Sequence, residues 1–430
     1  MKKDSVVLRI VFITAIIIVL LIPLLMIQSL INERQNYRYT AIREVAASWA
    51  NAQTLGGPIL TIAIKKEKTN EKGKKYFTTS YSHFLPENLF IDTEVTPEKR
   101  YKGIYEIILY KTKIKMKGNF NLQSINELLK DKDFESSFVS FNITDLKGIQ
   151  KNVVFKWNDK IYDVVPGIGV SKLFNSGITA EINPVANLAP QNFELEIYLN
   201  GIEQLNFIPL GKTTEVNLKS TWNNPSFAGA FLPSSREISK DGFSAKWIVN
   251  HFNRDYPQEW GHRIYDTMPS AMGVKFILPV DQYQKTMRTS KYGLMLIVLT
   301  FLSFFMIEIF SKKVIHPIQY LLVGLALLIF YSVLLSVSEY ISFQLSYILA
   351  ATIIIGLIAF YVKSIYQNYK IGFMIGGLLT MFYAFMYVIL QLQDYSLLLG
   401  NIALLIILAT IMFSTRKINW YELFKNKTNI

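Results

Sequence analysis

The chain contains no cysteine, and this absence removes several kinds of chemistry at once. Disulfide bonds, thiolate metal ligands and cysteine nucleophiles are all excluded. The histidines are few and isolated from one another, with no HxH, HxxxH or HExxH pattern that would favour a metal site. The sequence also lacks a GxSxG elbow and a P-loop. The sequence therefore contains none of these signals for an enzyme reaction, a metal or a cofactor, and we expect a protein that is not an enzyme.

Charged residues are scarce in two parts of the chain, where long apolar runs take their place. One run lies at the N-terminus and five follow one another in the last third. Each is close to the roughly 20 residues that a helix needs to cross the hydrocarbon core of a bilayer. The sequence therefore predicts a membrane protein with six transmembrane helices. They are expected at Val6–Ile27, Leu294–Phe310, Tyr320–Val337, Tyr347–Val362, Ile371–Leu390 and Leu397–Phe413.

The basic residues outside the long central segment orient the predicted spans. With six spans, eleven of them fall on one side, while the short loops 342–344 and 391–394 contain neither Lys nor Arg. The positive-inside rule makes that side the cytoplasm, so both termini are predicted to be cytoplasmic and the central segment is predicted to lie outside the cytoplasm. The eleven are Lys2, Lys3, Arg9, Lys312, Lys313, Lys363, Lys370, Arg416, Lys417, Lys425 and Lys427.

The chain is accordingly divided into four parts: an N-terminal anchor (1–31), a large extracytoplasmic domain with a membrane-proximal helix (32–291), a five-helix bundle (292–414) and a cytoplasmic tail (415–430). Alternating apolar and polar residues predict a β-dominated, sandwich-like domain. Asn200-Gly201 predicts a hairpin turn between two of its strands. A short helix is expected near Leu122–Leu129. Tyr37, Ala41, Val45 and Trp49 form one helical stripe, which either packs on its own domain or binds a partner.

The net charge of +13 does not indicate nucleic-acid binding. Much of the excess lies in the segments that orient the spans, and a domain outside the membrane meets no genomic DNA. We expect membrane lipids as partners, together with envelope polymers or envelope proteins. Nothing in the sequence fixes the oligomeric state.

Four lysines alternate along one predicted strand, and a period of two places their ammonium groups on one face. Such a row would suit anionic envelope material such as phospholipid headgroups. The alternatives are a solvated face or an edge strand that is charged against aggregation. The residues are Lys111, Lys113, Lys115 and Lys117.

Acidic and other polar residues within the predicted spans are candidates for an intramembrane polar network. The acids lie near span ends, and two serines share a helix face with one of them. They either form a proton or ion relay or make hydrogen bonds between helices. The candidates are Glu308, Ser332, Ser336, Glu339, Asp394 and Asn401. His316 and Gln319, beside Pro317, could make a cytoplasmic contact or simply start a helix.

Several stretches resemble the CreD family of bacterial inner-membrane proteins. HPIQYLLVGLAL and LLSVSEY are the most specific, and LNGIEQLNFIPLGKTTEVNLKSTW in the central segment supports them. The likeness extends over nearly the whole chain. It implies a role in cell-envelope integrity and envelope-stress tolerance, and it implies the same topology. It brings no assigned reaction, so no catalytic residues carry over.

Three hypotheses for the function follow. The first is a non-enzymatic envelope protein that binds envelope components or partner proteins through its periplasmic domain. The second is a transporter or lipid-handling protein that uses the acid-bearing helices. The third is a periplasmic hydrolase on a membrane tether. Deep, paired charges in the spans would favour the second, and a convergent triad or metal cluster would favour the third.

Overall fold

The computed structural model describes residues 6–69, 75–121, 133–170, 173–182, 190–261, 263–278, 282–311, 313–392 and 396–416. The chain forms two compact units. A helical unit comprises Met1–Arg38 and Val280–Ile430, and a β domain comprises Tyr39–Pro279. The first helix, α1 (Val6–Ser48), contributes residues to both units.

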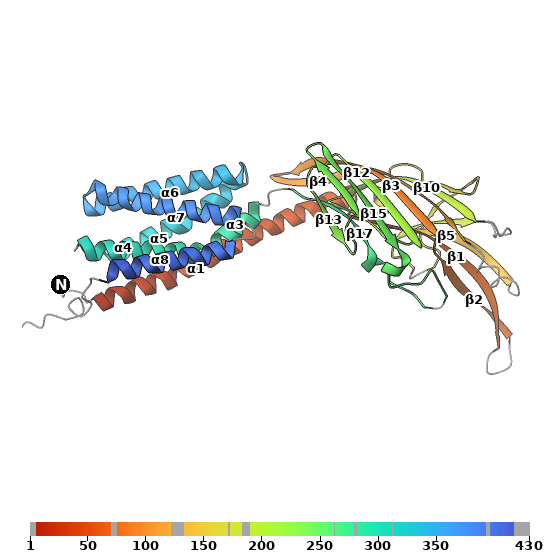
Figure 1. The fold of residues 1–430 in the computed structure, drawn as a ribbon, viewed down its shortest axis with the longest axis horizontal. Coiled ribbons are helices and arrows are strands. Elements are labelled where there is room, and N and C mark those ends of the chain that lie inside the picture. The colour runs from red at the N-terminus through yellow and green to blue at the C-terminus, as the bar shows by residue number, and fades with distance from the viewer. Residues whose placement is uncertain are drawn as a thin grey trace, which may run out of the picture. The chain divides into compact units, whose positions relative to one another are not determined.

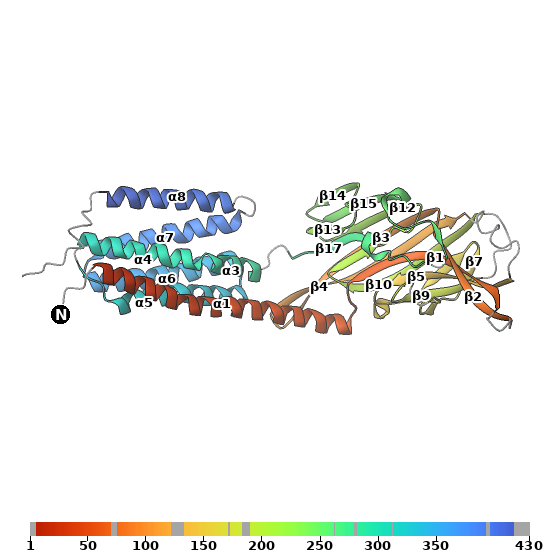
Figure 2. The same ribbon diagram turned by 90° about the horizontal axis from the view of Figure 1, so that it is seen from below.

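The helical unit is a bundle of apolar helices that run along a common direction (Figures 1 and 2). Within the described residues, five helices are long and apolar enough to cross a membrane, and α8 is a sixth apolar helix of 20 residues. The prediction of six transmembrane helices, one N-terminal and five C-terminal, is confirmed. Besides α1 the unit contains α3 (Gln282–Lys291), α4 (Gly293–Ser311), α5 (Pro317–Ser338), α6 (Phe343–Tyr366), α7 (Tyr369–Gln391) and α8 (Ser396–Thr415).

Glycines let α1 pack closely against the bundle. Leu20 and Leu24 of α1 are buried, as is Ile31 further along the helix. A Cβ atom at Gly324 of α5 would lie 2.2 Å from Cδ1 of Leu20, and one at Gly293 would lie 2.8 Å from Cδ1 of Leu24. Small residues at such contacts are how membrane helices gain packing contacts when no water is available to drive their association.

The β domain consists of two sheets, both visible in Figure 1. The eight-stranded sheet has the order β14-β15-β12-β3-β4-β10-β6-β7, and all its neighbours are antiparallel except β12 and β3. Its strands are β14 (Ser235–Ser239), β15 (Gly242–Asn250), β12 (Thr213–Ser220), β3 (Asn88–Lys102), β4 (Tyr105–Phe120), β10 (Gln191–Ile202), β6 (Val154–Trp157) and β7 (Lys160–Tyr162).

The nine-stranded sheet has the order β13-β17-β11-β1-β5-β9-β8, with β2 paired to β1 and β16 to β2. Here β1 and β11 are the parallel pair. Its strands are β13 (Pro225–Gly229), β17 (Met272–Phe276), β11 (Gln204–Phe207), β1 (Gln53–Thr69), β5 (Asp133–Ile143), β9 (Gly177–Ile182), β8 (Val165–Pro166), β2 (Lys75–Phe84) and β16 (Glu259–Trp260).

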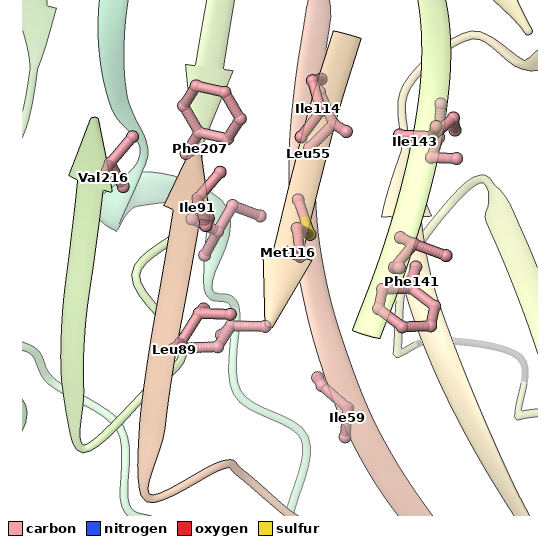
Figure 3. Close-up of a cluster of buried hydrophobic side chains, with 14 of the residues drawn as sticks. Leu55, Ile59, Leu89, Ile91, Ile114, Met116, Phe141, Ile143, Phe207 and Val216 are labelled. Atoms are coloured by element: carbon pink, nitrogen blue, oxygen red, sulfur yellow. The ribbon is translucent and has the colours of Figure 1, made fainter. Parts of the chain in front are cut away.

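A single hydrophobic core joins the two sheets. Alternate residues of β3 and β4 are buried, among them Ile91, Ile114 and Met116, and they meet Leu55 and Phe141 of the other sheet (Figure 3). Because the period of a strand is two, burying these residues leaves their neighbours on the outward face. The prediction of a β-dominated, sandwich-like domain is therefore confirmed.

The hairpin predicted at Asn200-Gly201 is wrong. Strand β10 continues through both residues, and the next strand, β11, lies in the other sheet. Gly201 is required there for packing, because a Cβ atom would lie 2.2 Å from the hydroxyl oxygen of Tyr110. The chain turns at Glu203, which has a positive φ of 54°. The glycine thus marks a close approach of a side chain to the backbone and not a turn.

The last turns of α1 pack on the β domain. Ala46 is buried with Ile107, Leu109 and Ile202, and Ile42, Val45 and Trp49 pack against this cluster. Of the two alternatives for the stripe between Tyr37 and Trp49, the structure shows the first: the stripe packs on its own domain. The segment Gln282–Lys291, which the sequence assigns to the extracytoplasmic domain, instead forms helix α3 of the helical unit. The helix expected near Leu122–Leu129 and nearly all of the tail at 415–430 lie outside the described residues.

Candidate functional site

The outward face of the eight-stranded sheet gathers the lysine row with side chains from neighbouring strands. On β4, Thr112, Ile114 and Met116 are buried, so the lysines between them point away from the core. Lys111, Lys113, Lys115 and Lys117 thus lie on one face of one strand. Strand β4 is central in its sheet, between β3 and β10. The alternative of a charged edge strand therefore does not apply to it.

Cross-strand register places an acid beside most of these lysines. Lys115 lies opposite Asp92 of β3 and Glu196 of β10, and Lys113 lies opposite Glu94 of β3. Directly opposed residues in antiparallel strands are close enough for their side chains to interact. Lys117 is likewise opposite Glu194. The face therefore alternates between positive and negative groups across the strands and is not uniformly cationic.

Glu196 holds two of the lysines. Its carboxylate oxygens lie 3.1 Å from Nζ of Lys113 and 3.5 Å from Nζ of Lys115. Hydrogen bonding to Tyr198 and Glu196 raises the pKa of Lys113, and the hydrogen bond from Lys113 lowers the pKa of Glu196. Lys111 instead lies 5.9 Å from the ring centroid of Trp49. Both members of the Lys113–Glu196 pair thus remain charged across the neutral pH range.

Three open depressions lie along this face. One of about 340 Å³ is bounded by Asp92, Lys113, Lys115 and Asn217. A second of about 460 Å³ shares Asp92, Asn217 and Lys219 with it and extends to Arg236 and Lys246. The third, of about 490 Å³, lies around Phe90, Lys117 and three asparagines: Asn119, Asn158 and Asn192. Their sizes are within the usual range for small-ligand sites, and most of the residues that line them are polar or charged.

The asparagine depression has side chains that are held in place. Asn158 donates from Nδ2 to Oε1 of Gln191 at 2.6 Å, and its Oδ1 accepts from the backbone N–H of Asn192 at 2.8 Å. Asn88 donates to Oδ1 of Asn119 at 3.0 Å. Amides fixed in this way present preorganised donors and acceptors, which suit hydroxyl and amide groups of a ligand.

The histidines are placed apart from one another. His83 is buried, its Nδ1 lies 2.9 Å from Oγ1 of Thr61, and its ring packs on Trp260. His251 packs on Phe252. His262 lies outside the described residues. Within the described part of the chain, no group of three or more His, Asp or Glu is placed to hold a metal ion.

In the helical unit, Glu308 forms a buried ion pair. Its side chain is 3% exposed, Oε1 accepts from Arg9 of α1 at 2.7 Å, and Oε2 accepts from the hydroxyl of Tyr320 at 3.0 Å. This cluster joins α1, α4 and α5. A paired and hydrogen-bonded carboxylate is the form in which an acid can be tolerated inside a membrane protein.

Glu339, the C-cap of α5, belongs to a different cluster. Oε1 accepts from the hydroxyl of Tyr283 at 3.2 Å and lies 3.9 Å from Nε of Arg34. Tyr320 is in the first turn of α5, so the Glu308 and Glu339 clusters are separated by roughly 28 Å of helix at 1.5 Å per residue. The structure does not bring these two acids together.

The other proposed members of the polar network are dispersed. Ser332 is half-buried, and Ser336 is exposed on α5. Asn401 is exposed on α8, and Asp394 lies outside the described residues. His316 is the N-cap of α5: its Nδ1 accepts from the backbone N–H of Ile318, while Oε1 of Gln319 accepts from the backbone N–H of His316 at 3.0 Å. This capping box gives both side chains a role in starting the helix.

Two arginines in these clusters were not identified from the sequence. In the sequence Arg9 stands out only as a charge that orients the first span, and no pattern singles out Arg34. They lie roughly 37 Å apart along α1 at 1.5 Å per residue, which is close to the thickness of a bilayer. An arginine near each end of a long apolar helix is a signal that acids on neighbouring helices could be its partners.

The six apolar helices and the β-sandwich define a multi-pass membrane protein with one large β domain between its first and second hydrophobic helices. Residues 5–421 match the family model described as inner membrane protein CreD. The chain is also 32% identical to inner membrane protein CreD of Escherichia coli (strain K12), over 94% of this chain and 91% of that protein. The chain therefore belongs to the CreD family of inner-membrane proteins.

Burial of His83 makes the stability of the β domain depend on pH. Burial lowers the pKa of His83 from 6.5 to about 4, so the folded domain takes up this proton only near pH 4, whereas the unfolded chain takes it up near pH 6.5. The free energy of unfolding should fall as the pH decreases from 6.5 to 4, by up to about 3 kcal/mol from this group. Well above pH 6.5 His83 is neutral in both the folded and the unfolded chain, so it no longer makes the free energy of unfolding depend on pH.

Denaturant unfolding of the detergent-solubilised chain, followed by tryptophan fluorescence, measures this effect. The matched control is His83→Gln, which should lose less stability than the wild type over that pH interval. If the free energy of unfolding fell equally with pH in the wild type and in His83→Gln, the lowered pKa of His83 would be contradicted. Five of the six tryptophans belong to the β domain and report on its unfolding: Trp49, Trp157, Trp222, Trp247 and Trp260. The sixth, Trp420, can be replaced by Phe.

Replacing Glu308 tests whether its cluster is structural. Glu308→Leu should destabilise the helical unit by about 3 kcal/mol, because Arg9 and Tyr320 lose their acceptor in a buried site. Glu308→Gln keeps an acceptor and should cost less. Ser336→Leu, at an exposed position, should be neutral. Thermal unfolding in detergent, followed by the circular dichroism of the helices, ranks the stabilities of the three variants. A relay role would instead leave Glu308→Gln fully stable and abolish function.

Proposed function

We propose that this CreD-family protein contributes to cell-envelope integrity and stress tolerance by a non-catalytic route. In this proposal the β domain binds an envelope polymer along the outward face of its eight-stranded sheet. The ligand is a glycan that carries hydroxyl, amide and both kinds of charged group, as the peptide-substituted glycan of the cell wall does. Membrane lipids surround the helices, and partner proteins remain alternatives for the same face.

The observation that carries this proposal is the alternation of charges and amides across the face. A row of lysines alone would favour purely anionic material. Here Glu196 lies within 3.5 Å of both Lys113 and Lys115, and Asn217 donates to Asp92 at 3.0 Å. A ligand with only negative charge would be attracted by the lysines but repelled by the acids beside them. A mixed polar polymer finds a complementary group at each position.

The shape of the face supports a chain-like ligand. Asp92, Asn217 and Lys219 line both of two neighbouring depressions, so a ligand that fills one reaches the next without leaving the sheet. Open polar depressions bind weakly one at a time, because water competes for each group. Several along one polymer would add their contributions, as in multivalent binding.

The positions of the acids do not favour the transporter alternative. A proton relay through the bundle needs titratable groups within reach of one another. Glu308 and Glu339 are each engaged by an arginine and a tyrosine, at opposite ends of α5. Ion pairs of this kind fasten helices together. We therefore place structural anchoring before transport in the proposal.

We also propose that both termini are cytoplasmic and that the β domain is periplasmic, on the strength of the eleven basic residues described above. The cysteine-free chain makes this directly testable. A single cysteine at Ser82 or Lys240 should react with a membrane-impermeant reagent in intact spheroplasts. One at Lys313 or Lys425 should react only after lysis. Reaction at Lys313 in intact spheroplasts would contradict the proposed topology.

Binding to purified cell-wall sacculi tests the proposed ligand. The double variant Asp92→Ala with Asn217→Ala removes polar groups that line two depressions, and it should bind sacculi roughly tenfold more weakly, the equivalent of one lost hydrogen bond of about 1.4 kcal/mol. The matched control, Glu181→Gln with Lys275→Gln, changes exposed residues of the other sheet and should bind as the wild type does.

Anionic liposomes provide the second arm of this experiment. The proposal expects weaker binding to liposomes than to sacculi, because the face contains acids as well as lysines. Replacing Lys111, Lys113, Lys115 and Lys117 by Gln together should then have little effect on liposome binding. Strong, salt-sensitive liposome binding that this variant abolishes would replace the polymer with an anionic membrane surface. Equal sacculus binding by the depression variant and the wild type would refute the proposed face.

A further inference from the structure

A groove of about 430 Å³ runs between α6 and α7. Small residues on the facing sides of the two helices let them approach closely, and this contact forms the floor of the groove. Gly372 lies so close to α6 that a Cβ atom would be 2.8 Å from Cβ of Lys363, and Gly376 faces Ala359. The next residue of α7, Gly377, has nothing within 4 Å of its Cβ position. The groove is therefore bounded by helix backbone and remains open at Gly377.

Two exposed phenylalanines border the groove. Phe360 of α6 is 66% exposed and Phe373 of α7 is 86% exposed. A neighbouring helix is about 10 Å wide and needs a flat, small-residue surface to approach closely. The bulky, exposed rings would hinder such a helix from approaching the groove closely. A single hydrocarbon chain, which is slender and flexible, fits between them.

The groove has a cation at the end where α6 ends and α7 begins. Nζ of Lys363 lies 3.9 Å from the ring centroid of Tyr369, and both residues line the groove. Lys370 follows in the first turn of α7. No Asp or Glu occurs between Tyr340 and Gln391, and within the described residues no carboxylate pairs with Lys363. The mouth of the groove thus carries a positive charge that no carboxylate of the described residues balances.

We propose that this groove binds one anionic phospholipid. Its acyl chain lies along Gly372, Gly376 and Gly377, and its phosphate is held by the ammonium group of Lys363. Apolar walls along membrane-spanning helices match a hydrocarbon chain, and a cation at the helix ends is at the depth of lipid headgroups. The charge of Lys363, with no acid nearby, selects an anionic headgroup over a zwitterionic one.

Native mass spectrometry of the full chain, purified in mild detergent and titrated with phosphatidylglycerol or phosphatidylethanolamine, tests this proposal. The wild type should retain one phosphatidylglycerol roughly tenfold more tightly than phosphatidylethanolamine. Gly377→Leu fills the groove without a clash and should abolish this retention. Gly356→Leu adds the same bulk at an exposed position of α6 with open space around it, and should leave retention unchanged.

Lys363→Gln separates the two parts of the site. It should remove the preference for phosphatidylglycerol while some retention of either lipid persists, and the control Lys370→Gln should keep the preference. Unchanged phosphatidylglycerol retention in Gly377→Leu would overturn the proposal. A shift between monomer and dimer in Gly377→Leu, with lipid retention unaltered, would also overturn it, because the groove would then hold a second copy of the chain. Size-exclusion profiles and helix circular dichroism establish that each variant is folded.

Discussion

Helix α1 has to satisfy two different environments, and its attachment to the bundle is the constraint on which the rest of the helical unit depends. Near its start, Arg9 pairs with Glu308, and near the end of its bundle segment Arg34 approaches Glu339. Between them Leu20 packs onto Gly324. A charge in hydrocarbon is tolerated only with a partner, so each arginine fixes the depth of α1 relative to α4 and α5. The glycines then determine how closely the helices approach.

The same helix also contributes to the β domain. Ala46, near the C-terminal end of α1, is buried against Ile107 and Leu109 of β4, and Lys102 pairs with Glu44. The row from Lys111 to Lys117 follows on that strand. Period-two alternation gives β4 two separate tasks: its buried residues hold the two sheets together, and its outward residues form the polar face. A change on one side of the strand therefore need not disturb the other.

Much of this architecture could be predicted from the sequence, because its signals are strong and local. Long apolar runs predicted six helices, and alternation predicted both the sandwich and the common face of Lys111, Lys113, Lys115 and Lys117. What lies opposite a residue depends on register between distant strands, which composition does not reveal. Thus Glu196 was not identified as the partner of Lys113 and Lys115. Asn200-Gly201 failed as a turn because its glycine makes room for Tyr110.

The buried acids illustrate the same limit in the membrane. Glu308 and Glu339 were identified as polar residues near span ends, but a single network could not be distinguished from two separate clusters without the pairing of α1 with α4 and α5. The sandwich, once formed, likewise brings together Asp92 and Asn217, which are far apart in sequence and line shared depressions. Local patterns predict the elements, and tertiary pairing decides which side chains share a site.

Cross-linking of engineered cysteines tests most directly whether α1 is a fixed member of the bundle. In the cysteine-free chain, Leu20→Cys and Gly324→Cys together should form a disulfide readily in membranes, because these positions are in close contact. Ile18→Cys with Gly324→Cys should not, since Ile18 is 60% exposed on another side of α1. Efficient cross-linking of the first pair alone is the predicted result. Equal cross-linking of both pairs, or of neither, would contradict the packing of α1 described here.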